Sequence, residues 1–387
     1  MVHRLIQSPI PRRKWPPNMA ELRVLFIVQG EGRGHLTQAL ALASILRRSG
    51  HSVCRAVVSQ GGDLVLPDYF EECLEAPVIQ VPSGRFFVNQ ETRSIDWGRT
   101  LVNNSFRWNE FNRSFAVLSE ILQTERPDII VNFFEPLAGF FMLRERPKIP
   151  MVAVGHQFMF LHPQYQFPVG FEVQKISAMT FTRLTGLGSE RRLALSLYDA
   201  PPLPEKKIVV MPPLLRDELF ELPEDVSEPY FLIYLYHHSL SKDVIAWHER
   251  NPTYRIHCFW NNDQAEEITH HSDTLTFHRL HGSRFLEMMA RCQGIVTTSG
   301  FETMAEAMYL RKPLMLNPLH KHFEQHCNGI DGTNLGAAIQ TNDLNLDRLV
   351  EFAPKYNYDA TELRSWIGKA EEMYVRELEM IASMKDS

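Results

Sequence analysis

The sequence contains few cysteines and none of the patterns in which cysteine builds structure. Five are scattered over 387 residues, their number is odd, and no two are spaced as C-x-x-C. This argues against a disulfide framework and against a zinc site made of cysteine pairs. It favours a reducing compartment, and we expect a cytoplasmic protein.

Long apolar runs and an excess of positive charge are also missing. No stretch approaches the roughly 20 apolar residues that a membrane span needs. The first 18 residues are basic and proline-rich without an apolar core, so they do not form a secretory signal. We expect residues 1–20 to be a disordered tail. The net charge of −6 offers no general nucleic-acid-binding surface, so no nucleic-acid partner is expected.

What is present is an alternation of strand-like and helix-like segments in two series. A chain of 387 residues exceeds the size at which one core keeps growing, so two domains are expected. Strands that alternate with helices predict parallel sheets covered by helices on both faces. The predicted strands are 22–29, 51–59, 128–134 and 150–156 in the first series, and 230–238, 255–260, 294–300 and 313–318 in the second.

The domain limits follow from this alternation and from one break in it. A proline- and acid-rich stretch after residue 209 shows no clear period and is the best linker candidate. We place the first domain at residues 21–212, the linker at 213–228 and the second domain at 229–360. The C-terminal segment, 361–387, is expected to hold one long helix from Thr361 to Lys385.

The glycine-rich loop QGEGRGH, residues 29–35, follows the first predicted strand. A dinucleotide site would need an acidic residue about 20 positions later, and a Walker A loop would need Gly-Lys-Ser/Thr. The sequence has neither here, which leaves two interpretations. The loop is a tight structural turn, or it lets a substrate hydroxyl approach His35, which would take its proton at the carboxyl edge of the sheet.

A second polar turn, Thr298-Ser299-Gly300, separates a predicted strand from a helix in the second series. Free N–H groups at that helix start, near Thr303, would suit a diphosphate. Glu306 lies three residues beyond Thr303 on the same face and would suit a pair of ribose hydroxyls. Alternatively, Thr303 and Glu306 only stabilise the first helical turn, and their spacing does not decide between these interpretations.

The stretch SGFETMAEAMYLRKPLMLNP followed by EQHCN resembles the donor-binding motif of GT-B glycosyltransferases. The likeness is to family 28 and the related UDP-glycosyltransferases, which include the peptidoglycan N-acetylglucosaminyltransferase. GEGRGHLTQALALASIL similarly resembles their acceptor-side loop. The motifs occur in the family's order, and the resemblance extends over about residues 21–385. It implies an α/β fold of two Rossmann-like domains that face each other across a cleft.

The resemblance also implies roles for individual residues. Glu306 matches the acid that holds the nucleotide ribose, and Glu324 with Gln325 matches the pair that binds the sugar hydroxyls. His35 matches the general base of inverting members. The implied donor-binding set is Thr298, Ser299, Gly300, Thr303, Glu306, Glu324, Gln325, Asn328 and, near the base, Leu280; the implied acceptor-side loop is Gly32, Arg33 and Gly34.

Two positions depart from the family pattern. Thr298 stands where many relatives have a histidine or an arginine that meets the diphosphate. The first strand of the second domain ends YLYHHSLS without the usual glycine, so His237, His238 or Ser239 would have to replace the phosphate loop. Both departures bear on the donor affinity that the resemblance implies: either other residues replace the missing groups, or phosphate binding is weaker than in the family. Neither affects the fold.

The reaction implied by the resemblance is the inverting transfer of a hexose from a nucleotide sugar, a UDP-sugar, to a hydroxyl of a glycan, lipid-linked or small-molecule acceptor. The diphosphate would leave at the helix start near Thr303. The sequence has no Asp-x-Asp motif to hold a metal on the diphosphate. We therefore expect no metal and no cofactor, with the nucleotide sugar as co-substrate.

Two other functions stay open at this point. A UDP-sugar 2-epimerase shares the two-domain architecture and would interconvert sugar nucleotides without an acceptor. A non-catalytic nucleotide-sugar-binding protein would fit the missing phosphate-loop glycine and Thr298.

Two further patterns have weaker functional interpretations. His320, His322 and His326 cluster, but no carboxylate or cysteine set completes a metal site. The segment SFRWNEFNRSF, residues 105–115, could bind an acceptor or make a peripheral membrane contact. A helix that buries its aromatic stripe is the favoured interpretation.

Overall fold

The computed structural model describes residues 21–30, 33–60, 66–67, 69–82, 108–223, 226–235, 240–262 and 264–384. The expected tail at 1–20, Gly32 of the acceptor-side loop, and His237, His238 and Ser239 lie outside the described residues.

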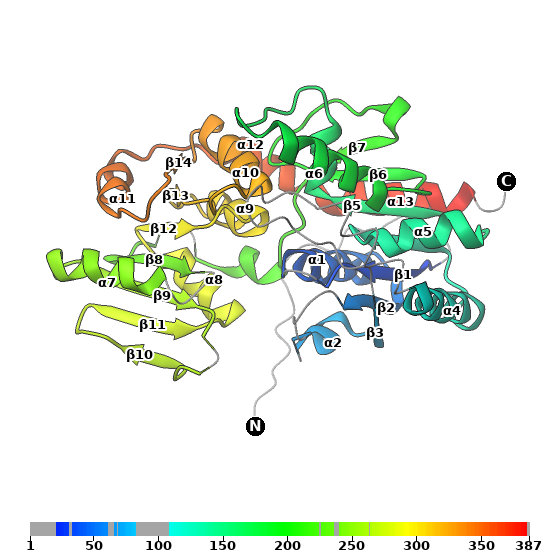
Figure 1. The fold of residues 1–387 in the computed structure, drawn as a ribbon, viewed down its shortest axis with the longest axis horizontal. Helices are drawn as coiled ribbons and strands as arrows, with labels where there is room; N and C mark the ends of the chain where they lie inside the picture. Colours follow the sequence, from blue (N-terminus) through cyan, green and yellow to red (C-terminus); the bar gives the residue numbers. More distant parts are fainter. Residues whose placement is uncertain are drawn as a thin grey trace.

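Two seven-stranded sheets occupy the two halves of the chain (Figure 1). The first has the order β3-β2-β1-β4-β5-β6-β7 and is parallel throughout. The second has the order β10-β11-β9-β8-β12-β13-β14 and is parallel except for β10. The first-sheet strands are β1 (Arg23–Val28), β2 (Ser52–Gln60), β3 (Val78–Pro82), β4 (Ile129–Phe133), β5 (Met151–Gly155), β6 (Arg191–Leu195) and β7 (Ile208–Met211). The second-sheet strands are β8 (Tyr230–Leu235), β9 (Arg255–Trp260), β10 (Ile268–His270), β11 (Leu275–Arg279), β12 (Gly294–Thr297), β13 (Leu314–Leu316) and β14 (Ala338–Gln340).

Helices cover both faces of the sheets, as the strand sequences require. In β1, Val24, Phe26 and Val28 join one hydrophobic core and Leu25 and Ile27 join another. A strand buried on both faces reads as a continuous apolar run, which is why the sequence revealed it. The α-helices are α1 (Gly34–Arg48), α2 (Tyr69–Leu74), α4 (Trp108–Glu125), α5 (Pro136–Glu145), α6 (Glu172–Thr185), α7 (Ser241–Arg250), α8 (Gly282–Arg291), α9 (Phe301–Tyr309), α10 (Phe323–Asn334), α11 (Asp347–Phe352), α12 (Thr361–Ile367) and α13 (Ala370–Ser383). The predicted α/β fold of two Rossmann-like units is confirmed.

The strand order reverses between β1 and β4 in the first sheet and between β8 and β12 in the second. Open α/β sheets bind ligands at such switch points, beyond the carboxyl ends of the strands. The loop that leads into α1 follows β1, and the turn Thr298-Ser299-Gly300 follows β12. The fold therefore places both sequence motifs where ligands are expected.

The single C-terminal helix predicted over Thr361 to Lys385 is wrong, because the segment forms two helices, α12 and α13. They are separated at Gly368 and Lys369, where the Lys369 N–H bonds to the carbonyl of Trp366, three residues back. Glycine is a poor helix former, and this tighter turn interrupts the helix. Helix α12 contacts α9 of the second half, whereas α13 returns to pack on β4, β5 and β7 of the first (Figure 1).

The segment between β7 and β8 is anchored to the first half by charge. Arg48, in the last turn of α1, bonds to both carboxylate oxygens of Asp217 at 2.7 and 2.8 Å. The same guanidinium bonds to Glu371 of α13 at 2.9 Å. One arginine thus ties together the first helix, the linker and the last helix.

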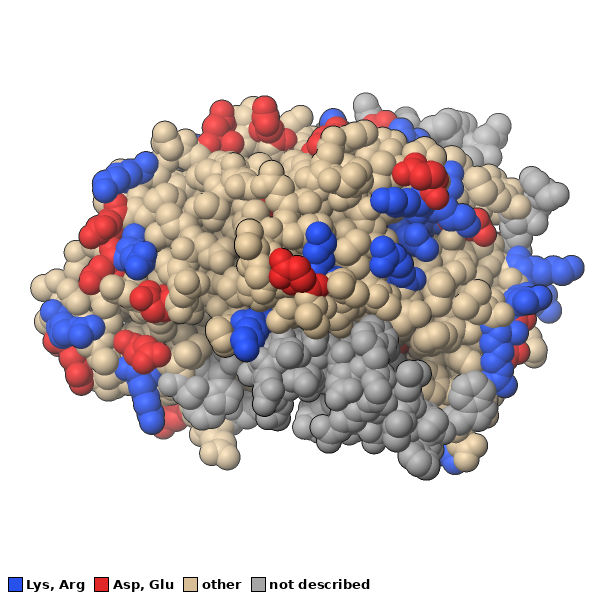
Figure 2. Space-filling view, turned by 45° about the horizontal axis from the view of Figure 1, so that its top comes forward, with Lys and Arg blue, Asp and Glu red and all other residues tan. Residues whose placement is uncertain are grey.

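The aromatic segment 105–115 lies partly outside the described residues, and from Trp108 onwards it forms the start of α4. Phe115 is buried and packs against Phe141 of α5 with ring centroids 5.8 Å apart. This agrees with a helix that buries its aromatic stripe. Among the described residues, no helix is both long and apolar enough to cross a bilayer. On the face seen in Figure 2, acidic and basic side chains are mixed rather than gathered by sign.

The return of α13 to the first half predicts a stability effect at Tyr374. This side chain is fully buried, and its hydroxyl donates a hydrogen bond to the carbonyl of Pro212 at 2.9 Å. We expect Tyr374→Phe to lower the free energy of unfolding by about 1 kcal/mol and Tyr374→Ala by about 3–5 kcal/mol. Urea denaturation measures both. The matched control is Met380→Ala on the same helix, where the side chain is 38% exposed. If Tyr374→Ala cost no more than this control, α13 would not be docked as described.

Candidate active site

A cavity of about 800 Å³ lies between the two halves of the chain and is lined by both. It brings together most of the residues singled out from the sequence. Those that line it are Arg33, Gly34 and His35 from the first half, and Leu280, Thr298, Gly300, Thr303, Glu306, Glu324 and Gln325 from the second. The remaining predicted residues within the described part of the chain, Ser299 and Asn328, do not line the cavity.

Ser299 and Asn328 lie behind the turn that precedes α9. Ser299 is fully buried and has a left-handed backbone conformation with φ of 66°. The side-chain amide of Asn328, itself buried, donates to the carbonyl of Ser299 at 2.9 Å. Asn328 therefore fixes the shape of the turn from behind rather than presenting a group to the cavity.

The start of α9 is open on its cavity side. Gly300 is the N-cap residue and supplies no side-chain cap to the first N–H groups. A Cβ atom added at Gly300 would meet nothing within 4 Å, so there is free space in front of the helix end. Uncapped N–H groups and the helix dipole make this position suitable for an anion.

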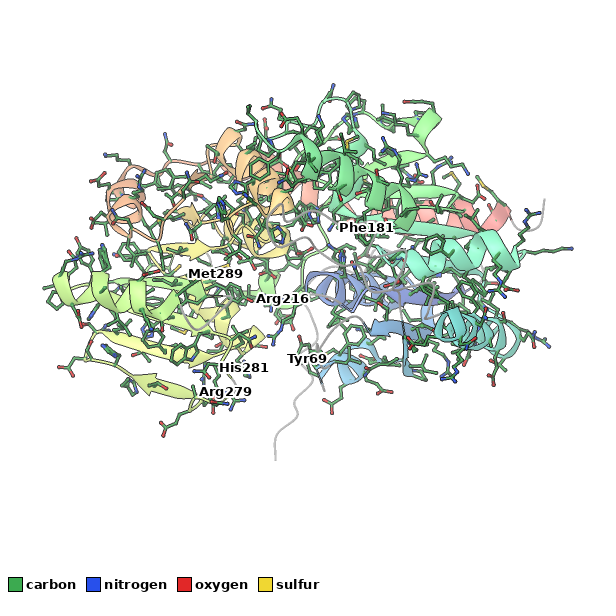
Figure 3. The ribbon with its side chains drawn as sticks, in the orientation of Figure 1. Tyr69, Phe181, Arg216, Arg279, His281 and Met289 are labelled. Atoms are coloured by element: carbon green, nitrogen blue, oxygen red, sulfur yellow. The ribbon has the colours of Figure 1, made fainter. Side chains whose placement is uncertain are left out.

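Glu306 is buried in α9 and is paired with an arginine that the sequence did not reveal. Arg216, from the linker, bonds to its two carboxylate oxygens at 2.7 and 2.9 Å. Figure 3 shows Arg216 at the junction of the two halves. A carboxylate offers about four acceptor sites, so Glu306 can still accept bonds from a ligand. The only sequence signal for Arg216 is a basic residue inside a proline-rich linker.

His35 lies in the first turn of α1, buried at the edge of the cavity. Its ring stacks on Phe134 at a centroid distance of 5.6 Å, and its Nδ1 lies 3.2 Å from the side-chain oxygen of Gln38. Burial lowers the pKa of His35 below its usual 6.5, and the nearby Glu302 carboxylate offsets only part of this effect. The imidazole is therefore uncharged at neutral pH and able to accept a proton.

Glu324, at the start of α10, pairs across the cleft with His156, a second residue that sequence analysis missed. The Nε2 of His156 lies 3.2 Å from the Glu324 carboxylate, and its ring stacks on Phe301 at 4.6 Å. Burial opposes charge on His156, but Glu324 outweighs it and raises the pKa of His156. Burial likewise favours the neutral form of Glu324, but His156 lowers its pKa to about 2. The pair is thus ionised at pH values between the usual 4.5 of a glutamate and the usual 6.5 of a histidine.

The neighbouring Gln325 has a structural bond. Its side-chain oxygen accepts a hydrogen bond from the backbone N–H of Leu319 at 2.8 Å. Gln325 therefore holds the loop before α10 while it lines the cavity.

The first-half wall of the cavity is aromatic. Phe134, Phe160 and Phe181 line it, and Phe323 faces them from the second half. Helix α6 adds polar side chains to the lining, namely Gln174, Ser177 and Thr182. Figure 3 shows Phe181 above Arg216, on the side of the first sheet. This wall suits a ligand with an apolar face and few charges.

Two of the three clustered histidines noted in the sequence, His322 and His326, make separate structural bonds. The ring of His322 caps α10 by accepting from the backbone N–H of Gln325, and His326 bonds to Gln340 of β14 at 3.2 Å. Within the described ranges, no three histidine, cysteine, aspartate or glutamate side chains are grouped as a metal site.

The family model for glycosyl transferase family 1 matches residues 22–356. No curated protein matches the chain in sequence. Solved structures with a similar fold include the calicheamicin glycosyltransferase (15% identity, TM-score 0.61, 94% of this chain and 99% of that one). A second is Arabidopsis thaliana UGT89C1 complexed with quercetin (15% identity, TM-score 0.58, 95% of this chain and 100% of that one). A third is the spinosyn rhamnosyltransferase complexed with thymidine diphosphate (16% identity, TM-score 0.57, 92% of this chain and 100% of that one). The predicted GT-B architecture is confirmed by these similarities.

The His156–Glu324 pair predicts a pH window for stability. Since the pKa of His156 is raised above 6.5 and that of Glu324 is lowered from 4.5, the contribution is fully present between these values. It is lost as the pH rises through the folded pKa of His156, or falls towards that of Glu324. We expect His156→Gln to lower the free energy of unfolding by about 1 kcal/mol near pH 5.5 and by less at pH 8. Denaturation at both pH values measures this.

Glu324→Gln and the double variant are the controls for this prediction. Each should show the same loss near pH 5.5, because either single change removes the whole pair. A difference between wild type and His156→Gln that stays constant from pH 5.5 to 8 would contradict the assignment.

Proposed function

The chain belongs to glycosyl transferase family 1, and we propose that its cavity transfers a hexose from a nucleotide sugar, a UDP-sugar, to a hydroxyl-bearing acceptor. The observation that carries this proposal is that His35 and the open start of α9 line the same cavity from opposite halves of the chain. A base and an anion site on two sides of one cavity are the parts that glycosyl transfer from a diphosphate requires.

The nucleotide sugar is proposed to bind on the second half. Its diphosphate would lie at the uncapped start of α9, near Thr298 and Thr303, and its ribose would bond to Glu306. Leu280 would pack beside the base. The spinosyn rhamnosyltransferase was solved with thymidine diphosphate and Arabidopsis thaliana UGT89C1 with UDP-L-rhamnose, which supports a pyrimidine nucleoside diphosphate as the leaving group.

The sugar is proposed to lie between the donor side and His35. Glu324 and Gln325 line this part of the cavity and would accept or donate bonds to the sugar hydroxyls. The hydroxyls must share Glu324 with His156, so binding of the sugar changes a contact that joins the two halves. The aromatic wall would hold an acceptor with an apolar face. Arabidopsis thaliana UGT89C1, which has a similar fold, was solved with quercetin, a ligand of this kind.

The proposed reaction is a single displacement at the anomeric carbon. His35 takes the proton of the acceptor hydroxyl while that oxygen forms the new glycosidic bond. The bond to the diphosphate breaks, and the leaving oxygen carries its electron pair to the N–H groups of α9. The product has inverted anomeric configuration, and the chain's own donors, rather than a metal ion, stabilise the diphosphate.

Donor binding is tested by a thermal-shift screen of nucleoside diphosphates and nucleotide sugars. A ligand at 100 times its dissociation constant stabilises the folded form by about 2.7 kcal/mol, which raises the melting temperature by several degrees. We expect a shift for one nucleotide series and its loss in Glu306→Gln, because the amide accepts fewer hydrogen bonds. Glu351→Gln, an exposed change on α11, is the matched control and should keep the shift. No shift with any nucleotide would reject the donor site.

Catalysis is tested at His35 with the nucleotide sugar found in that screen. His35→Ala should lower kcat for transfer by about 10²- to 10⁴-fold while the thermal shift with the same nucleotide persists. A panel of phenolic, glycan and polyprenol acceptors supplies the hydroxyl. Conversion of the nucleotide sugar to its 2-epimer without acceptor would identify an epimerase instead. Binding without turnover, unaffected by His35→Ala, would identify a non-catalytic binding protein.

A further inference from the structure

A chain of two hydrogen bonds leads from the imidazole of His35 across the cleft. The Nδ1 of His35 lies 3.2 Å from the side-chain oxygen of Gln38, and the side-chain amide of Gln38 donates to the carboxylate of Glu302. His35 and Gln38 are on α1, whereas Glu302 is in the first turn of α9. Gln38 is 1% exposed, so water does not compete for its bonds.

The chemistry of these three groups fixes the position of one proton. A carboxylate only accepts hydrogen bonds, so the Gln38 group that faces Glu302 must be the NH₂. The amide oxygen therefore faces His35, and an oxygen can only accept. The hydrogen must lie on Nδ1 of the imidazole. In the neutral ring, Nε2 then carries the free electron pair.

We propose that Gln38 and Glu302 are positioning residues that hold His35 in the tautomer protonated at Nδ1, which leaves Nε2 as the proton acceptor for the reaction. This inference rests on the proposed function for the role of the tautomer, but the tautomer itself can be measured without turnover. Gln38 and Glu302 transfer no proton and touch no reacting atom; they act through the orientation of the ring.

The surroundings of Glu302 support a built contact. A Cβ atom at Gly34 would lie 2.6 Å from a carboxylate oxygen of Glu302, so a larger residue at this position would displace the carboxylate from its place at the first turn of α1. That turn has no side-chain cap from Arg33 and no acidic residue of its own. The positive end of the α1 dipole therefore stabilises the Glu302 carboxylate.

The contact also resolves a conflict at the donor site. A carboxylate in the first turn of α9 would repel a diphosphate bound at the same helix end. Bonded to Gln38, Glu302 points towards α1 instead. The base is then correctly oriented only while α1 and α9 are in contact, which links proton transfer to the closed arrangement of the two halves.

The tautomer is tested directly by NMR on protein labelled with ¹⁵N-histidine, at about pH 8, where a ring with lowered pKa is neutral. Two-bond ¹⁵N–¹H correlations distinguish the two tautomers, and His35→Ala assigns the signals. We expect His35 to be protonated at Nδ1 in the wild type and at Nε2, or in exchange, in Gln38→Met. Gln340→Met removes a glutamine–histidine bond of the same kind, to His326, outside the cavity and should leave the His35 signals unchanged. A wild-type His35 protonated at Nε2, or an unchanged pattern in Gln38→Met, would overturn the proposal.

Kinetics test the functional consequence. Gln38→Met and Glu302→Gln should each lower kcat at least tenfold, as part of the 10²- to 10⁴-fold effect of a general base, with the KM for the nucleotide sugar nearly unchanged. Gln38→Met removes the bridging amide, and Glu302→Gln replaces an acceptor-only group by one that also donates, so that it no longer fixes the orientation of Gln38. The double variant should be no slower than the slower single one, because both changes act on the same bridge. Independent, additive losses, or full activity in Gln38→Met, would refute a positioning role.

The pH profile gives a readout that a merely structural role would not move. The charged groups that face His35 are Glu302, Glu324 and His156, and Glu302 raises the pKa of His35. A general base is active when neutral, so the acid limb of kcat/KM in Glu302→Gln should move to lower pH; an acid limb that stays in place would contradict the bridge. If no nucleotide sugar is turned over at all, the proposed function fails, and the NMR measurement still decides the tautomer.

Discussion

The arrangement of the two halves depends on carboxylates in the cleft that are each held by a partner from outside their own half. Three glutamates of the second half point into the cleft, and each is paired with a side chain from outside that half. The pairs are Glu302–Gln38, Glu306–Arg216 and Glu324–His156. Removing Arg216 would leave the buried charge of Glu306 unpaired and cost several kcal/mol. Glu302 and Glu324 are only partly buried, so their pairs contribute less. The Glu302 and Glu324 pairs join the two halves directly, and the Glu306 pair joins the second half to the linker.

This constraint shapes how a ligand must bind. Each of the three glutamates already has a partner, so a ligand hydroxyl has to join an existing pair or displace a member of it. At Glu306 it can join, because bidentate binding of Arg216 leaves acceptor sites on the carboxylate. At Glu324 the imidazole of His156 lines the cavity too, so it would compete with a hydroxyl of the proposed sugar. Exchange at Glu324 would thus couple occupancy of the proposed sugar site to the contact between the halves, whereas a bond added at Glu306 would not.

The sequence predicted those parts of the molecule that are encoded locally. The strands β1 and β5 contain continuous apolar runs, and the turns at Gly34 and Gly300 follow runs of this kind, so both motifs could be placed at sheet edges. Arg216 and His156 were missed because their partners lie 90 and 168 residues away, respectively, and nothing near either residue indicates the pairing. The three-residue strands β10 (Ile-Thr-His) and β14 (Ala-Ile-Gln) are short and partly polar, so they were missed, whereas the equally short β13 (Leu-Met-Leu) is wholly apolar and was predicted. The break at Gly368 was missed because apolar spacing typical of a helix continues on both sides of it, and only the packing partners differ.

The position of the glycine-rich loop in the fold was predicted correctly, but the sequence alone did not show why the loop needs glycines. Glycines after a strand usually let a phosphate approach the backbone. Here Gly30 packs against β2, where a Cβ atom would overlap the carbonyl oxygen of Ser59, and its N–H bonds to the Ser59 hydroxyl at 3.1 Å. Gly34 makes room for the carboxylate of Glu302. Both described glycines are therefore explained by contacts within the protein, one to the neighbouring strand and one across the cleft. A loop that resembles an anion site does accommodate an anion, and that anion is a side chain of the opposite half.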